Sequence, residues 1–109
     1  MYETLKTALL ALTDISFCEW AWKTRPRGDY GTIRLDFEVD ADNGDNSKVD
    51  RAWEGSVDLF LHAPDGTKEA EVETQLEAVC GDSWTENSRQ YEAETGLLHI
   101  EWTFQVEGR

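Results

Sequence analysis

Cysteine and long apolar runs are both scarce in this sequence. Its two cysteines, Cys18 and Cys80, are too few for a disulfide framework or for a cluster at metal-binding spacing. We expect both to be reduced, mostly buried thiols, as free cysteines usually are. No stretch reaches the roughly 18 consecutive apolar residues of a membrane-spanning helix. Glu3 precedes only a short apolar run, so we do not expect a signal peptide.

Basic residues are few as well. The 109 residues include 10 Lys and Arg against 23 Asp and Glu, which gives a net charge of −13. A surface of that sign repels the phosphates of DNA and anionic lipid, so we expect neither sequence-specific nucleic-acid binding nor membrane binding. The length allows one hydrophobic core, and we expect residues 1–109 to form a single domain.

Side chains that catalyse reactions or hold metals form no recognisable motif. His62 and His99 are expected on strands, turned away from the apolar stripes, and neither has a partner at ligand spacing. Residues 40–45 begin like a calcium loop, but that register needs Gly at 45 and an acid at 51, where the chain has Asp45 and Arg51. A weak divalent-ion site there is the alternative to a solvated hairpin tip. We predict no catalytic, cofactor-binding or metal site, and no enzyme activity.

Apolar spacing predicts two helices. One covers residues 2–13, and the other runs from a capping Thr67 to Cys80, with Gly81 ending it. Five strands are expected from alternating apolar residues, at 15–22, 30–40, 53–61, 84–94 and 98–106.

The element order, α-β-β-β-α-β-β, predicts an α+β fold. We expect a mostly antiparallel sheet of four to five strands with both helices packed on one face. The core is expected to contain the apolar stripes of these elements: Leu5, Leu9, Leu12, Ile33, Leu35, Phe37, Val57, Leu59, Leu76, Ile100, Trp102 and Phe104.

Five tryptophans are more than one small core easily buries. Trp53 and Trp102 lie on apolar stripes and are expected in the core. Trp20 and Trp22 precede the basic segment 23–27 and are expected to contact a partner, because Trp is enriched at interfaces. Arg25 and Arg27 could then pair with the acidic hairpin tip of a neighbouring copy. The candidate interface residues are Trp20, Trp22, Arg25, Arg27, Asp42 and Asp45.

Taken whole, the chain resembles short proteins of tailed phages and prophages that are described as tail completion, tail terminator or minor capsid proteins. The resemblance rests on six segments: MYETLKTALLAL at 1–12, ISFCEWAW at 15–22, YGTIRLD at 30–36, ADNGD at 41–45, WEGSVDLFL at 53–61 and LHIEWTFQV at 98–106.

The resemblance implies a structural protein of the virion. Family members form a ring, generally of six subunits, that ends the tail tube and meets the head-tail connector. The expected partners are other copies of the chain, the tail tube protein and the connector proteins, while DNA passes through the ring. The expected location is the bacterial host cytoplasm during assembly and then the virion tail. Acidity leaves an alternative open, an inhibitor, immunity-like protein or DNA mimic that covers a basic partner.

Overall fold

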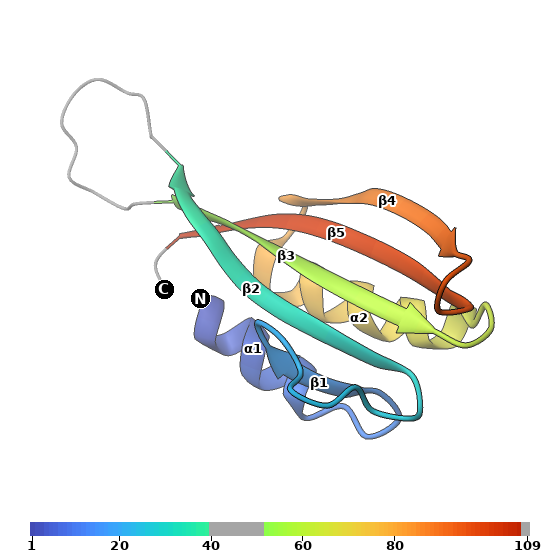
Figure 1. Ribbon diagram of the computed structural model, residues 1–109. Coiled ribbons are helices and arrows are strands. Elements are labelled where there is room, and N and C mark those ends of the chain that lie inside the picture. Colours follow the sequence, from blue (N-terminus) through green and yellow to red (C-terminus); the bar gives the residue numbers. More distant parts are fainter. Residues whose placement is uncertain (40–51, 108–109) are drawn as a thin grey trace, which may run out of the picture.

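The structure is a computed structural model that describes residues 1–39 and 52–107 (Figure 1). It has two helices and five strands in the predicted order: α1 (Tyr2–Leu10), β1 (Ser16–Glu19), β2 (Tyr30–Val39), β3 (Ala52–Leu61), α2 (Gly66–Cys80), β4 (Trp84–Glu92) and β5 (Leu97–Glu107). The strands form one sheet in the order β1-β2-β3-β5-β4.

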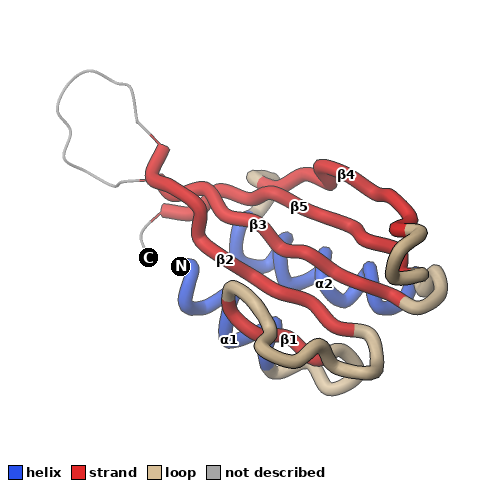
Figure 2. The backbone as a smooth tube through the Cα atoms, in the orientation of Figure 1, coloured by secondary structure: helices blue, strands red, loops and turns tan. Residues whose placement is uncertain are grey.

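The sheet is mostly antiparallel, as predicted. The pairs β2–β3, β3–β5 and β4–β5 are antiparallel, and only the short edge strand β1 runs parallel to its neighbour β2. Both helices lie on the same face of the sheet, behind the strands in the view of Figure 2. We call this covered side the inner face and the opposite side the outer face. The α+β prediction is therefore confirmed.

The core lies between the inner face and the helices. Trp102 is completely buried at its centre, and Leu5, Leu9 and Leu76 of the helices are buried against the strands. Most predicted core residues are confirmed: Leu5, Leu9, Ile33, Val57, Leu59, Leu76, Ile100, Trp102 and Phe104. Leu12, Leu35 and Trp53 are only partly buried at the margin.

Phe37 is the one predicted core residue that the structure places in solvent. Its side chain is 54% exposed, because the register shifts in β2. Leu35 pairs with Gly55 and Phe37 with Glu54, so the intervening Asp36 has no opposite residue. One extra residue reverses the in-out alternation of a strand. Phe37 consequently lies on the outer face, and its placement in the core was wrong.

Several element ends differ from the prediction. Helix α1 ends at Leu10, before the expected end at Thr13. The N-cap of α2 is Asp65, whose carboxylate accepts hydrogen bonds from the backbone N–H groups of Thr67 and Lys68, so Thr67 is not the cap. Gly81 ends α2 as predicted, with a φ of 64° that suits glycine. His62 follows β3 in a bend instead of lying on a strand.

The two cysteines lie where they were expected, on β1 and at the end of α2. Both are free thiols, and both are half-buried. Burial raises the pKa of the Cys80 thiol to about 11, and it also raises the pKa of Cys18. Both side chains therefore stay protonated at neutral pH and are poor nucleophiles.

Shortening a buried core side chain and shortening the exposed Phe37 should affect the free energy of unfolding differently. Replacing the buried Ile100 by Ala should lower the free energy of unfolding by about 2–5 kcal/mol, since it leaves a cavity. Replacing the exposed Phe37 by Ala should change it by no more than about 0.5 kcal/mol. Denaturant titration measures both values. A large loss for Phe37→Ala would show that the bulge is misplaced.

Candidate functional site

The segment between β1 and β2 crosses the outer face. Two parallel strands cannot be joined by a tight turn, so residues 20–29, here called the crossover loop, must return the chain to the start of β2. The loop leaves β1 at Trp20, whose φ of 73° is unusual for a bulky residue. The Trp20 N–H donates to the carbonyl oxygen of Ile33 at 2.9 Å, which fixes this turn. The indole is 56% exposed as a result.

Two further contacts hold the crossover loop in place. The Trp22 indole N–H donates to the carbonyl oxygen of Gly31 at 3.1 Å. At the end of the loop, Asp29 accepts hydrogen bonds from Lys68 Nζ at 2.6 Å and from the His62 backbone N–H at 2.9 Å. Burial alone would raise the pKa of Asp29, but the bonds from Lys68 and His62 outweigh it and lower that pKa. The loop is thus tied to β2 and to the start of α2.

An open groove of about 500 Å³ lies between the crossover loop and the outer face. Its aromatic wall comes from neighbouring strands, where the ring of Phe60 stacks on Tyr30 at 4.7 Å and on His99 at 4.2 Å between centroids. The groove is lined by Trp20, Ala21, Trp22, Arg25, Tyr30, Thr32, Arg34, Asp58, Phe60, His99 and Glu101. It therefore combines aromatic surface with charges of both signs.

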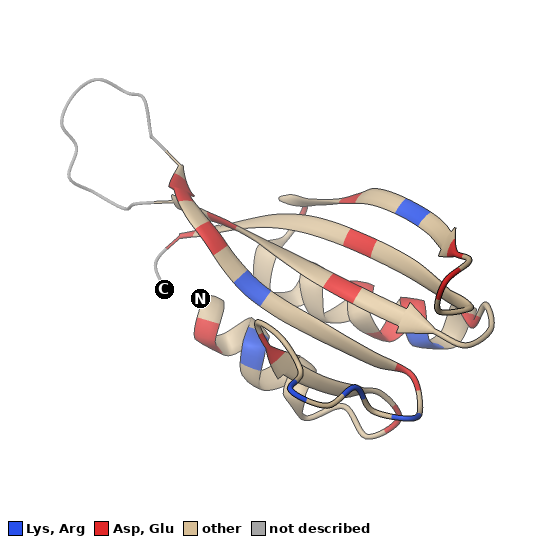
Figure 3. Cartoon of the chain, in the orientation of Figure 1, with Lys and Arg blue, Asp and Glu red and all other residues tan. Residues whose placement is uncertain are grey.

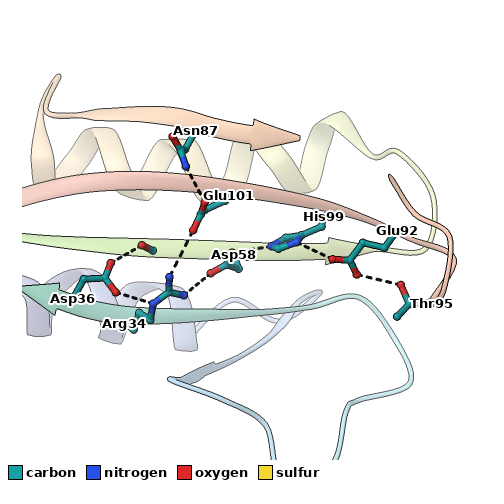
Figure 4. A network of polar contacts seen from close by, with 9 residues as sticks. Arg34, Asp36, Asp58, Asn87, Glu92, Thr95, His99 and Glu101 are labelled. Atoms are coloured by element: carbon teal, nitrogen blue, oxygen red, sulfur yellow. Dashed lines mark hydrogen bonds and ion pairs between the residues drawn. The ribbon is translucent and has the colours of Figure 1, made fainter. Parts of the chain in front are cut away.

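Asp58 lines this groove and lies between Arg34 and His99 (Figure 4). It is only 6% exposed, and each carboxylate oxygen has its own partner. Arg34 Nη1 donates to Oδ2 at 2.9 Å, and His99 Nε2 lies 2.7 Å from Oδ1. A buried charge is costly without such partners. Asp58 therefore depends on Arg34 and His99, which come from the strands on either side.

The network continues in both directions along the outer face (Figure 4). Arg34 Nε donates to Asp36 at 2.7 Å, and Arg34 Nη2 lies 3.6 Å from Glu101. On the other side His99 Nδ1 lies 3.0 Å from Glu92. The bulged residue Asp36 is thus used as a partner for Arg34, and β2, β3 and β5 are linked by side chains as well as by backbone hydrogen bonds.

His99 has a carboxylate at each ring nitrogen. The hydrogen bond to Asp58 is the main cause that raises its pKa, burial opposes it, and Glu92 adds to the increase. Both nitrogens donate only in the protonated imidazolium. This arrangement favours the charged form of His99 and makes the network sensitive to pH.

The crossover loop also contains a group of basic residues, whose positions are coloured blue in Figure 3. Lys6, Arg34, Lys68 and Arg89 each form an ion pair within the molecule. Lys23, Arg25 and Arg27 are exposed, and none of the three has an ion-pair partner among residues 1–39 and 52–107. Within these two ranges their charges are therefore not neutralised by a carboxylate.

The structure brings together part of the predicted interface. Trp20, Trp22 and Arg25 line the groove, and Arg27 belongs to the same loop but not to the groove lining. Asp42 and Asp45 lie outside the described residues. The Arg34–Asp58–His99 network was not predicted, because the sequence alone does not establish which strands are neighbours. The available signal was the occurrence of opposite charges at outer-face positions of three strands.

In residues 1–39 and 52–107, no three His, Cys, Asp or Glu side chains are grouped so that they could hold a metal ion. Neither described helix is long and apolar enough to cross a membrane.

Comparisons with known proteins give a structural likeness only. No protein-family model matches the chain. No curated protein matches it in sequence. Nineteen chains of solved structures are similar in fold. One, from the structure "Virion of native gene transfer agent (GTA) particle", has a TM-score of 0.57 and 14% identity over 99% of this chain and 95% of that chain. At this identity the likeness establishes a shared fold over nearly the whole length of both chains.

The His99 network predicts a pH-dependent contribution to stability. Because the folded pKa of His99 is raised, its stabilising effect is complete below the unfolded pKa of about 6.5 and is lost as pH rises through the folded pKa. The free energy of unfolding of the wild type should exceed that of His99→Gln by about 1–3 kcal/mol at low pH, and by less at high pH. Denaturant titrations from about pH 5 to 9 measure this margin. A margin that is constant with pH would contradict a charged His99.

Proposed function

We propose that this chain is a structural virion-assembly protein of a tailed phage or prophage, without catalytic activity. The observation that carries the proposal is the fold shared with a chain of the gene transfer agent virion, over 99% of this chain and 95% of the other. Fold alone does not determine function. The sequence segments that resemble tail completion and tail terminator proteins favour the same assignment.

The finer role that we propose is that of a tail terminator. In this role, copies form a ring, generally of six, at the end of the tail tube, stop its growth and contribute to head-tail joining. The sheet supports such a ring because its two edge strands, β1 and β4, are different surfaces on opposite sides. Contacts between two different surfaces form a closed ring when the rotation that relates neighbouring copies brings the last copy back to the first. A net charge of −13 would also keep DNA from adhering to the wall of the ring.

The role at the tube end can be tested with a tail tube protein from the same genome. Tubes assembled with this chain present should be shorter and more uniform in length, with extra density at one end in electron micrographs. Assembly without the chain provides the control. If the chain neither binds tube ends nor changes their length distribution, the terminator role is wrong.

Self-association should depend on salt in a characteristic way. Copies that each carry −13 repel one another, and the screening length is about 10 Å at 0.1 M salt. We expect monomers in dilute low-salt buffer and increasing association between about 0.02 and 0.5 M, measured by sedimentation velocity. Association that falls steadily with salt would contradict the repulsion argument. A monomer at every salt concentration that forms a stoichiometric complex with a basic nuclease would favour the acidic-inhibitor alternative.

A further inference from the structure

We propose that the crossover loop of one copy docks into a groove between α2 and β4 of a second copy, through Trp20 and Arg25. This contact specifies how copies associate head to tail, and it rests on the self-assembly proposed above. The occupant of the groove is a second copy of this chain.

The surface of the crossover loop has apolar and charged parts that no other described residue covers or pairs with. The Trp20 indole is 56% exposed, and its backbone has a φ of 73°. A bulky residue at such a φ costs about 1–3 kcal/mol and is found most often at functional positions. Arg25 and Arg27 lie further along the same loop and have no ion-pair partner among the described residues. Trp and Arg are the residue types most enriched at interface hot spots, and Trp20 and Arg25 line the same groove.

The surface that would receive the loop is an open groove of about 480 Å³ between α2 and β4, at the sheet edge opposite β1. It is lined by Ala70, Glu73, Thr74, Glu77, Ala78 and Trp84. Its small side chains leave room for an inserted aromatic ring, and the half-buried Trp84 supplies one wall. The groove is therefore mostly apolar, with two carboxylates at its margin.

Those two carboxylates are held in position by indole groups. The Trp102 indole N–H donates to Glu73 at 3.0 Å, and the Trp84 indole N–H donates to Glu77 at 3.3 Å. Neither Glu73 nor Glu77 forms an ion pair with a residue of 1–39 or 52–107. By contrast, Glu69 at the start of the same helix is already paired with Arg89. The carboxylates of Glu73 and Glu77 can accept further hydrogen bonds. This suits guanidinium groups, which bind carboxylates through two hydrogen bonds.

The two surfaces cannot meet within one molecule. The crossover loop leaves β1 at one edge of the sheet, and the α2–β4 groove lies at the opposite edge and on the inner side. Five strands spaced about 4.8 Å apart separate the two edge strands by roughly 19 Å. A copy can therefore fill its groove only with the loop of a neighbour, and the contact is heterologous.

Charge reversal on each surface tests the contact. Arg25→Glu and Glu77→Arg should each weaken self-association at least about tenfold, because each places like charges together. An equimolar mixture of the two variants should associate more strongly than either alone, and the double variant, whose net charge equals that of wild type, should recover association. Sedimentation velocity at fixed salt measures all four. Glu94→Arg, which makes the same charge change as Glu77→Arg on the exposed β4–β5 turn, should not weaken association.

A second variant tests the groove without touching its carboxylates. Ala78→Arg on the exposed side of α2 keeps a good helix former and fills the groove, so it should also reduce association at least about tenfold while circular dichroism stays that of wild type. If wild type forms oligomers but these variants associate as the Glu94→Arg control does, the docking contact is wrong and ring assembly stands. If wild type remains monomeric at every salt concentration and at tube ends, ring assembly fails and the contact fails with it.

Discussion

The parallel pairing of β1 with β2 is the constraint on which the rest of the outer face depends. A hairpin connection is excluded for this pair, so the chain must return over the outer face between Glu19 and Tyr30 to begin β2 in the same direction. That crossing creates the groove, turns the indole of Trp20 outward and places three basic side chains on one loop. The pairing also depends on glycine at position 31, which lies opposite Phe17. A Cβ there would lie 2.5 Å from the ring of Phe17, which is too close.

The outer face is held by charges instead of a second apolar layer. Asp58 is nearly as buried as the core residues, yet it lies on the side without helices, covered by the aromatic wall and the crossover loop. Arg34 compensates its charge from one flanking strand, and His99 forms a hydrogen bond with it from the other. The register of β2, β3 and β5 is therefore specified twice, by apolar residues on the inner face and by complementary charges on the outer face.

The fold could largely be predicted from the sequence because its apolar residues follow the helical and strand periods closely. Ile100, Trp102 and Phe104 alternate without interruption and are buried. The failure at Phe37 has a local cause, since a bulge depends on how two strands pair and leaves no mark in a single strand's alternation. The Asp58 network could not be predicted for a related reason, because strand order is a long-range property. For the candidate interface, composition indicated the residues of one surface, Trp20, Trp22 and Arg25, but gave no indication of the groove beside α2.

The hydrogen bonds from Trp102 and Trp84 to the carboxylates of α2 affect the entropy of any association at that helix. A glutamate side chain in solvent samples many rotamers, and fixing them on binding costs roughly 0.5–1.5 kcal/mol per side chain. Glu73 and Glu77 are already restrained by indole N–H groups from the sheet. Much of that ordering cost is therefore met when the chain folds, so a cation arriving at the helix meets acceptors with little rotational freedom left to lose.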